Sequence, residues 1–73
     1  IWGQVGAFYA ETSANVVLKK VSVIGAGEVS SVNRLGKTLY RVRLGPTTDV
    51  VAADNLLDKV INIGFGGARI VVD

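Results

Sequence analysis

The sequence contains no cysteine and no histidine. Without cysteine the chain can form no disulfide bond and offers no thiol nucleophile, and without either residue it lacks the usual ligands of a structural zinc site. A serine-protease triad also requires a histidine. We therefore expect a noncatalytic domain that uses neither a metal ion nor a cofactor.

Length and charge are limited as well. The chain has 73 residues, and eight Lys and Arg against six Asp and Glu give a formal net charge of +2. Domains usually contain about 100–200 residues, so we expect one small domain. The small charge gives no support for binding duplex DNA through charge alone. No apolar run approaches the roughly 18–20 residues that cross a bilayer, so we expect no membrane contact by this domain.

Both ends of the chain have the pattern of strands. The segments Ile1–Val5 and Ala68–Val72 are apolar and β-rich, and neither is a polar tail of the kind that often ends a whole protein. We therefore expect residues 1–73 to form a single module excised from a longer protein.

The first half of the chain predicts a strand, a helix and a second strand. The first strand is expected to end at Gly6, in a turn formed by Gly6-Ala7-Phe8. Apolar residues at helical spacing over Ala10–Val21, with hydroxyl and acidic residues near the start, predict an amphipathic helix. Glu28–Arg34 is β-rich, but Val29 and Val32 lie three residues apart, which requires a bulge or an exposed valine.

The second half predicts a hairpin, a helix and a last strand. Leu35-Gly36-Lys37-Thr38 has the composition of a turn and leads into a strand over Leu39–Gly45, which Pro46 ends because it cannot donate a ladder hydrogen bond. Residues 47–49 are capping residues for a helix, and a final strand is expected over 68–72. Gly64 is expected just beyond the end of that helix. The expected apolar stripe of the helix consists of Val50, Ala53, Leu56, Leu57, Val60 and Ile61.

The order of these elements, β-α-β-β-α-β, is typical of an α+β fold with a split β-α-β arrangement, as in ferredoxin-like and RNP-like domains. This arrangement places both helices on one face of a four-stranded antiparallel sheet, with the first and third strands in the middle. The opposite face of the sheet is then bare, and a bare face in a small domain is either polar or binds a ligand.

Side-chain alternation predicts which residues lie on the bare face. If Val5, Tyr40, Val42 and Leu44 face the helices, the alternate positions point away from them. The resulting surface combines apolar, amide and guanidinium groups, which suits a sugar ring with its C–H faces and its hydroxyl, amide and carboxylate groups. The residues expected there are Trp2, Gln4, Leu39, Arg41, Arg43 and Arg69.

Two motifs resemble those of a known family. They are Gln4-Val5-Gly6-Ala7-Phe8 and Tyr40-Arg41-Val42-Arg43-Leu44-Gly45-Pro46, each leading into a helix with an alanine at a similar place, Ala14 or Ala53, and the second helix is followed by Gly64-Phe65. Over nearly the whole chain this pattern is similar to the SPOR (sporulation-related repeat) domain, a peptidoglycan-binding module of bacterial cell-envelope proteins. The second motif most resembles the C-terminal domain of the rare lipoprotein A family of septal-ring lytic transglycosylases.

The resemblance implies binding to denuded peptidoglycan glycan strands, from which amidases have removed the stem peptides. It also implies that the domain targets its parent protein to the division septum, within the periplasm or cell envelope. Removal of the peptide frees the lactyl carboxylate of each N-acetylmuramic acid, and an arginine fork can bind that anion. Any lytic activity would belong to another domain of the parent protein.

The resemblance implies five glycan-binding positions, at Gln4, Ala7, Leu39, Arg41 and Arg69. Some relatives have Ser in place of Ala7, Trp in place of Leu39 and an apolar residue in place of Arg69. Alternation along the strands adds two further candidates. Arg43 is either a glycan contact or a solubilising charge, and Trp2 either replaces the missing stacking surface or covers the edge of the sheet.

Two other functions are compatible with this topology. The same order of elements serves RNA-recognition motifs, which stack bases on aromatic residues of the sheet. Here the third strand offers Leu39, Arg41 and Arg43 in those places, so single-stranded nucleic-acid binding is the weaker alternative and no nucleic-acid partner is expected. A regulatory or assembly module that dimerises through a sheet edge also fits the sequence, which leaves the oligomeric state open.

Overall fold

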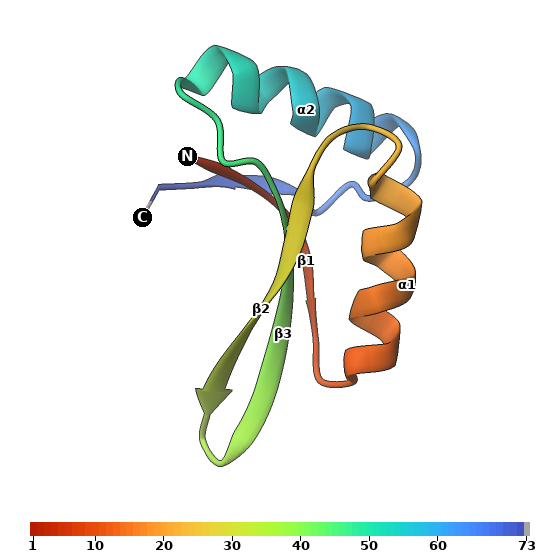
Figure 1. The fold of residues 1–73 in the computed structure, drawn as a ribbon, viewed down its shortest axis with the longest axis vertical. Helices are drawn as coiled ribbons and strands as arrows, with labels where there is room; N and C mark the ends of the chain where they lie inside the picture. The colour runs from red at the N-terminus through yellow and green to blue at the C-terminus, as the bar shows by residue number, and fades with distance from the viewer. Residues whose placement is uncertain (73) are drawn as a thin grey trace.

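The computed structural model describes residues 1–72, which form four strands and two helices in the predicted order (Figure 1). All strand pairs in the sheet are antiparallel, with the order β2-β3-β1-β4, so the first and third strands lie in the middle. The predicted α+β fold is therefore confirmed. The elements are β1 (Trp2–Phe8), α1 (Glu11–Val21), β2 (Gly27–Arg34), β3 (Lys37–Leu44), α2 (Val50–Asn62) and β4 (Arg69–Val71).

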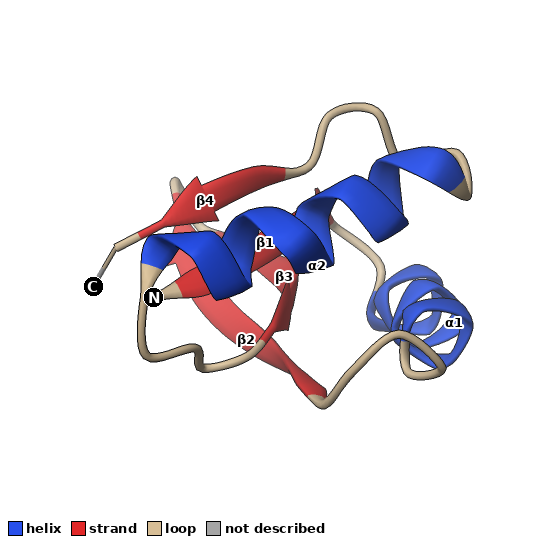
Figure 2. Cartoon of the chain, turned by 90° about the horizontal axis from the view of Figure 1, so that it is seen from above, coloured by secondary structure: helices blue, strands red, loops and turns tan. Residues whose placement is uncertain are grey.

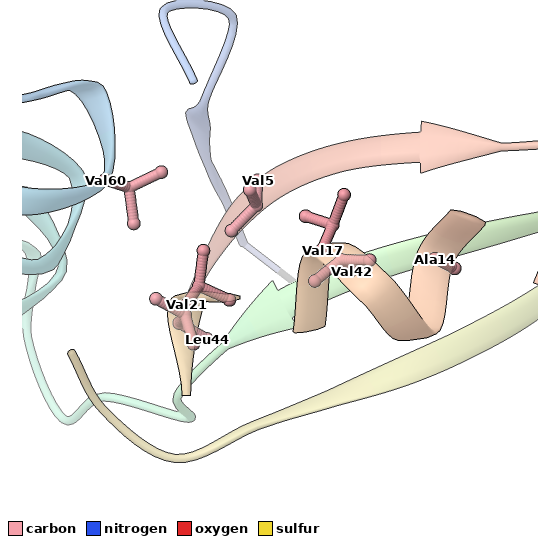
Figure 3. Packing of buried hydrophobic residues seen from close by; sticks show 7 residues of the cluster. All are labelled: Val5, Ala14, Val17, Val21, Val42, Leu44 and Val60. Carbon is pink, nitrogen blue, oxygen red and sulfur yellow. The ribbon is translucent and has the colours of Figure 1, made fainter. Parts of the chain in front are cut away.

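Both helices pack on the same face of the sheet. α1 contacts β1, β2 and β3, whereas α2 lies along β1 and β4 (Figure 2). Side chains of both helices meet those of the two central strands (Figure 3), and each fully buried Val or Leu contributes about 1.5–3 kcal/mol relative to an exposed one. This cluster consists of Val5, Ala14, Val17, Val21, Val42, Leu44 and Val60.

The strand β1 is longer than predicted and contains a β-bulge. It continues to Phe8, so the turn predicted at Gly6-Ala7-Phe8 is wrong. Gln4 pairs with Arg43 and Gly6 pairs with Val42, so two residues of β1 oppose a single residue of β3. Beyond the bulge the alternation is shifted by one position, which brings Ala7 onto the same face of the sheet as Gln4.

The β2–β3 hairpin turns over two residues, Leu35 and Gly36, whose φ angles are 53° and 79°. Two positive φ values are typical of a tight hairpin turn. The four-residue turn predicted from the sequence is therefore wrong, and Lys37 already belongs to β3. β2 pairs with β3 without a bulge, which places Val29 opposite Val42 on the helix side, and Val32 on the other face. The tip of the hairpin extends beyond the rest of the molecule (Figure 1).

The helix ends show which capping signals operate. α1 follows Ala10, which makes no side-chain capping bond, so the hydroxyl and acidic residues predicted to start this helix lie within its first turns. α2 is capped as predicted by the Asp49 carboxylate, which accepts a 2.8 Å hydrogen bond from the Ala52 N–H. Neither helix in residues 1–72 is long and apolar enough to cross a membrane.

The end of α2 is a Schellman motif. Gly64, with φ of 113°, donates to the Ile61 carbonyl, and Phe65 donates to the Val60 carbonyl while its ring packs on the core. The predicted glycine position is thus confirmed. The predicted apolar stripe is too wide, because Val50 and Ile61 are 50% and 43% exposed.

The close approach of Gly27 to β3 generates a test of the hairpin packing. A Cβ atom at Gly27 would lie 2.6 Å from the Arg43 carbonyl oxygen and 2.8 Å from Leu44 Cδ2. We expect Gly27→Ala to lower the free energy of unfolding by about 1–3 kcal/mol, because the two strands must separate to admit the methyl group. Urea denaturation followed by circular dichroism measures this loss.

The matched control for this variant is Gly66→Ala. A Cβ atom at Gly66 would have no heavy atom within 4 Å, and the φ of this glycine is not positive, so stability should stay unchanged or rise slightly. Equal stability of the wild type and the Gly27→Ala variant would contradict the close approach.

Candidate functional site

The face of the sheet opposite the helices, called the open face below, carries every site residue predicted from the sequence. The strand register places these side chains in rows that run across the sheet. One row joins Arg69, Gln4, Arg43 and Glu28 across all four strands, and the next joins Ala7, Arg41 and Ser30. The other members of the open face are Trp2 and Val71 at one end, Leu39 and Val32 toward the hairpin, and Arg34 and Lys37 at its tip.

The centre of the open face holds Gln4 on β1 and Arg41 on β3. Both residues are half-buried, and within residues 1–72 neither side chain makes a hydrogen bond or an ion pair with the protein. The amide offers two donors and an acceptor, and the guanidinium offers a planar fork of donors. Ala7 lies beside Arg41 and is too small to block access to it.

Arg43 differs from Arg41 because the protein itself holds its guanidinium. Its Cζ lies 4.4 Å from the centre of the Trp2 ring, and its Nη2 lies 3.3 Å from Glu28 Oε1. The side chain is only 11% exposed although no helix covers this face. Arg43 therefore links β1, β2 and β3 through its side chain, and its role in glycan binding stays a prediction.

Trp2 lies at the end of the open face where β3 reaches Gly45. A Cβ at Gly45 would lie 3.5 Å from Trp2 Cε3, so the indole rests against this glycine as well as against Arg43. Trp2 is half-buried. At the other end, Leu39 and Val32 are paired neighbours and form a small apolar area. The open face thus has an apolar area at each end and polar groups between them.

The electrostatic balance of the open face is positive. Arg41, Arg43 and Arg69 lie on it, with Arg34 and Lys37 at the hairpin tip, and within residues 1–72 its one acidic side chain, Glu28, is paired with Arg43. Arg69 is exposed. No closed pocket is present in residues 1–72, so a ligand would lie along the surface and would not enter a cavity. Phe8 and Tyr40 pack against the core on the opposite side, as alternation predicted for Tyr40.

The open-face residues on β2, among them Glu28, Ser30 and Val32, were not predicted from the sequence. The hairpin turn decides their partners on β3. A two-residue turn at Leu35-Gly36 pairs Glu28 with Arg43, whereas the four-residue turn expected from the sequence gives a different register. The sequence signal that identifies these residues is therefore the tight turn itself.

Comparison with known proteins identifies the family. A family model described as the SPOR domain matches residues 2–70. The chain belongs to the SPOR domain family. The crystal structure of the RlpA SPOR domain from Pseudomonas aeruginosa is similar to this SPOR domain with a TM-score of 0.89 and 30% sequence identity, covering 99% of this chain and 97% of that one. None of the curated proteins compared with the chain matches it.

SPOR domains are noncatalytic modules that bind peptidoglycan in the bacterial cell wall, and the predicted function is confirmed at this level. The likeness to the RlpA domain also agrees with the relative suggested by the second motif. The individual residues that contact peptidoglycan in this SPOR domain, and the form of peptidoglycan that it binds, stay predictions.

The different surroundings of the two neighbouring arginines on β3 generate a stability prediction. Arg43→Ala removes the contact with Trp2 and the ion pair with Glu28, and should lower the free energy of unfolding by about 1–2 kcal/mol. Arg41→Ala removes no side-chain hydrogen bond within residues 1–72 and should change it by less than about 0.5 kcal/mol. Thermal and urea denaturation of both variants measure this difference, and a larger loss for Arg41→Ala would contradict it.

Proposed function

We propose that this SPOR domain binds denuded glycan strands, polymers of N-acetylglucosamine and N-acetylmuramic acid without stem peptides, along its open face. The observation that carries the proposal is that two unengaged polar side chains, Gln4 and Arg41, lie on neighbouring central strands of a sheet face that no helix covers. Both belong to the motifs through which the sequence resembles the family.

Each group on the open face has a counterpart on such a strand. The Arg41 fork binds the lactyl carboxylate of N-acetylmuramic acid, and Gln4 exchanges hydrogen bonds with sugar hydroxyl or acetamido groups. Leu39, with Val32 beside it, supports the C–H face of a sugar ring, and Ala7 leaves room for close approach. Arg43 and Trp2 hold the surrounding surface in place and border the bound strand.

Selectivity for denuded strands follows from charge and bulk. An attached stem peptide converts the lactyl carboxylate into an amide, which removes the anion that Arg41 binds. The peptide also adds bulk next to a flat surface that has no pocket to receive it in residues 1–72. Both effects weaken the binding of strands that keep their peptides.

The biological role that we propose is targeting. Denuded strands accumulate where amidases work at the division septum, so a module that binds them brings its parent protein to that place. We propose that residues 1–73 act as one such module of a longer protein in the periplasm or cell envelope. The membership of the chain in a family of noncatalytic cell-wall-binding domains supports this role.

No observation favours the alternatives. Among the strand residues of the described chain, Trp2 is the one aromatic side chain on the open face, since Phe8 and Tyr40 pack on the helix side. Tyr9, which follows β1, is exposed and lies near Lys37, far along the sheet from Trp2. Two widely separated rings are a poor platform for stacking successive bases. We therefore propose no nucleic-acid partner. The outer strand β2 carries polar residues such as Ser31, Asn33 and Arg34, which give no support for dimerisation through this edge.

The binding test uses peptidoglycan sacculi before and after amidase digestion. The wild-type domain should be retained more strongly after digestion, while single-stranded RNA should retain it weakly. Gln4→Ala and Arg41→Ala should each weaken binding to digested sacculi by about 1–3 kcal/mol without unfolding the domain, because each removes hydrogen bonds to the glycan.

Lys59→Ala is the matched control for the loss of one positive charge, since Lys59 is exposed on α2, away from the open face. Its binding should equal that of the wild type. Equal retention on digested and undigested sacculi would contradict the preference for denuded strands. Full binding by both the Gln4→Ala and Arg41→Ala variants would contradict the choice of face.

A further inference from the structure

We propose that copies of this SPOR domain contact one another head to tail, with the hairpin tip of one copy seated on the outer face of α2 in the next. The hairpin tip consists of residues 34–37, and the outer face of α2 carries Val51, Asp54, Asp58 and Ile61. Copies bound along one glycan strand then bind cooperatively, a consequence that rests on the proposed function.

The first observation is the residue at the apex of the hairpin. Leu35 is 98% exposed and has a φ of 53°, a backbone conformation that leucine rarely adopts and that Gly, Asn and Asp favour at this place in a turn. The side chain adds nothing to the core, and the left-handed backbone is strained. Since the fold gains nothing from a leucine here, we attribute this residue to an apolar contact outside the domain.

Two basic side chains flank this leucine. Arg34 and Lys37 are cross-strand partners and both are exposed. In the part of the chain that the structure describes, Arg34 has no hydrogen bond or ion pair, and the Lys37 ammonium lies 5.8 Å from the centre of the exposed Tyr9 ring. Paired positions place the two Cβ atoms about 4.5–5.5 Å apart. The tip therefore presents one apolar side chain beside two neighbouring positive charges.

The outer face of α2 has the opposite charge. Asp54 and Asp58 are exposed and one helical turn apart, so their Cβ atoms lie about 5–6 Å from each other. Like charges at this spacing destabilise a helix, and no ion pair among the described residues compensates for them. Val51, one turn before this pair, is 69% exposed, and Ile61, one turn after it, is 43% exposed. This face thus complements the hairpin tip in charge, in charge spacing and in apolar surface.

The two surfaces lie at opposite ends of the longest axis of the molecule. The hairpin tip is at the bottom of Figure 1 and α2 is at the top. Seen from above, α2 lies over β1, which it contacts, so its outer face points away from the sheet along that axis (Figure 2). A shift of one copy along the axis by about its 35 Å length brings a tip onto the α2 of its neighbour. All open faces then stay on the same side.

In this arrangement the two cations of the tip face the two carboxylates of α2, and Leu35 packs on Val51. A hairpin tip on one helix buries much less than the roughly 1,200–2,000 Å² of a standard interface, so the contact is weak in free solution. Its dissociation constant is expected in the millimolar range.

A glycan strand raises the population of this contact. The apolar areas of the open face, at Trp2 and Leu39, lie at its two ends, so a glycan strand that meets both runs toward the hairpin tip, where the next copy follows. Neighbouring copies on one strand have an effective concentration of the same millimolar order as the dissociation constant. The contact therefore forms between bound copies and makes their binding cooperative.

The test exchanges the charges of the two surfaces. One variant carries Arg34→Glu and Lys37→Glu, which makes both its tip and its α2 acidic. The other carries Asp54→Lys and Asp58→Lys, which makes both surfaces basic. Each variant alone should associate at least about tenfold more weakly than the wild type, whereas an equimolar mixture should regain association, because each tip then meets an α2 of opposite charge. Sedimentation equilibrium and concentration-dependent NMR shifts at low salt measure the association.

A substitution of Leu35 separates the contact from the fold. Asn adopts a positive φ more readily than Leu, so Leu35→Asn should unfold no more easily than the wild type, while its self-association should weaken by about tenfold. The control for charge reversal combines Lys19→Glu with Lys20→Glu, both exposed on α1. It changes the net charge as much as the tip variant does and should leave association unchanged. Circular dichroism checks the fold of every variant.

Binding to glycans tests the cooperative part. The wild type should bind long denuded strands with a sigmoidal isotherm, and a denuded tetrasaccharide, too short for two copies, with a simple one. Leu35→Asn should bind the tetrasaccharide within about twofold of the wild type and should lose the sigmoidal shape on long strands. A sigmoidal isotherm that survives in Leu35→Asn, or a simple one for the wild type, would overturn cooperative binding through this contact.

The outcomes separate the head-to-tail contact from the proposed function. If the mixture of charge variants stays monomeric, or if either variant alone associates as strongly as the wild type, the contact is wrong and the proposed function stands. If the charges restore association but no denuded glycan binds, the proposed function is wrong and the contact stands. Sedimentation of the wild type with phosphatidylglycerol vesicles, without self-association, would assign the hairpin tip to a lipid surface and overturn the contact.

Discussion

The open face depends on one backbone irregularity, the bulge in β1. In a regular strand Gln4 and Ala7, three residues apart, would lie on opposite faces of the sheet. Because Val5 and Gly6 together oppose Val42, both positions lie outward while Val5 is buried beneath the helices. The five-residue motif Gln4-Val5-Gly6-Ala7-Phe8 thus places Val5 in the core and both Gln4 and Ala7 on the open face.

The contacts of Arg43 with Trp2 and Glu28 fix the side-chain arrangement at the centre of the open face, although no helix covers that face. The Arg43 guanidinium on β3 contacts the Trp2 indole on one neighbouring strand and the Glu28 carboxylate on the other. Two glycines permit this arrangement, since Gly27 on β2 allows close approach to the Arg43 backbone and Gly45, directly after β3, leaves space for the indole. The unengaged groups of Gln4 and Arg41 lie next to this rigid cluster, which reduces the ordering needed when a ligand binds.

The sequence predicted the element order, the two central strands and the outward direction of six side chains. The spacing of apolar residues along the chain indicates both the type of each element and the side of each strand that faces the core. It did not predict the bulge, although Gly6 inside a β-rich motif is a known signal for one. The turn was predicted too long because Leu35 is an unusual residue at a positive φ, and the register of β2 was lost with it. Two further features depend on tertiary packing, which the local sequence pattern does not show. Val50 and Ile61 are exposed, and the Arg43 guanidinium packs on the Trp2 ring.

The central claim is that a glycan strand lies on the sheet and not on the helices. An NMR titration of the isotope-labelled domain with a denuded tetrasaccharide tests it most directly. The largest chemical-shift changes should occur at the Gln4 side-chain amide, the Arg41 Nε–H and the backbone of β1 and β3, with α1 and α2 unchanged. Changes centred on exposed residues of α1 or α2, with the Gln4 and Arg41 signals unmoved, would contradict it.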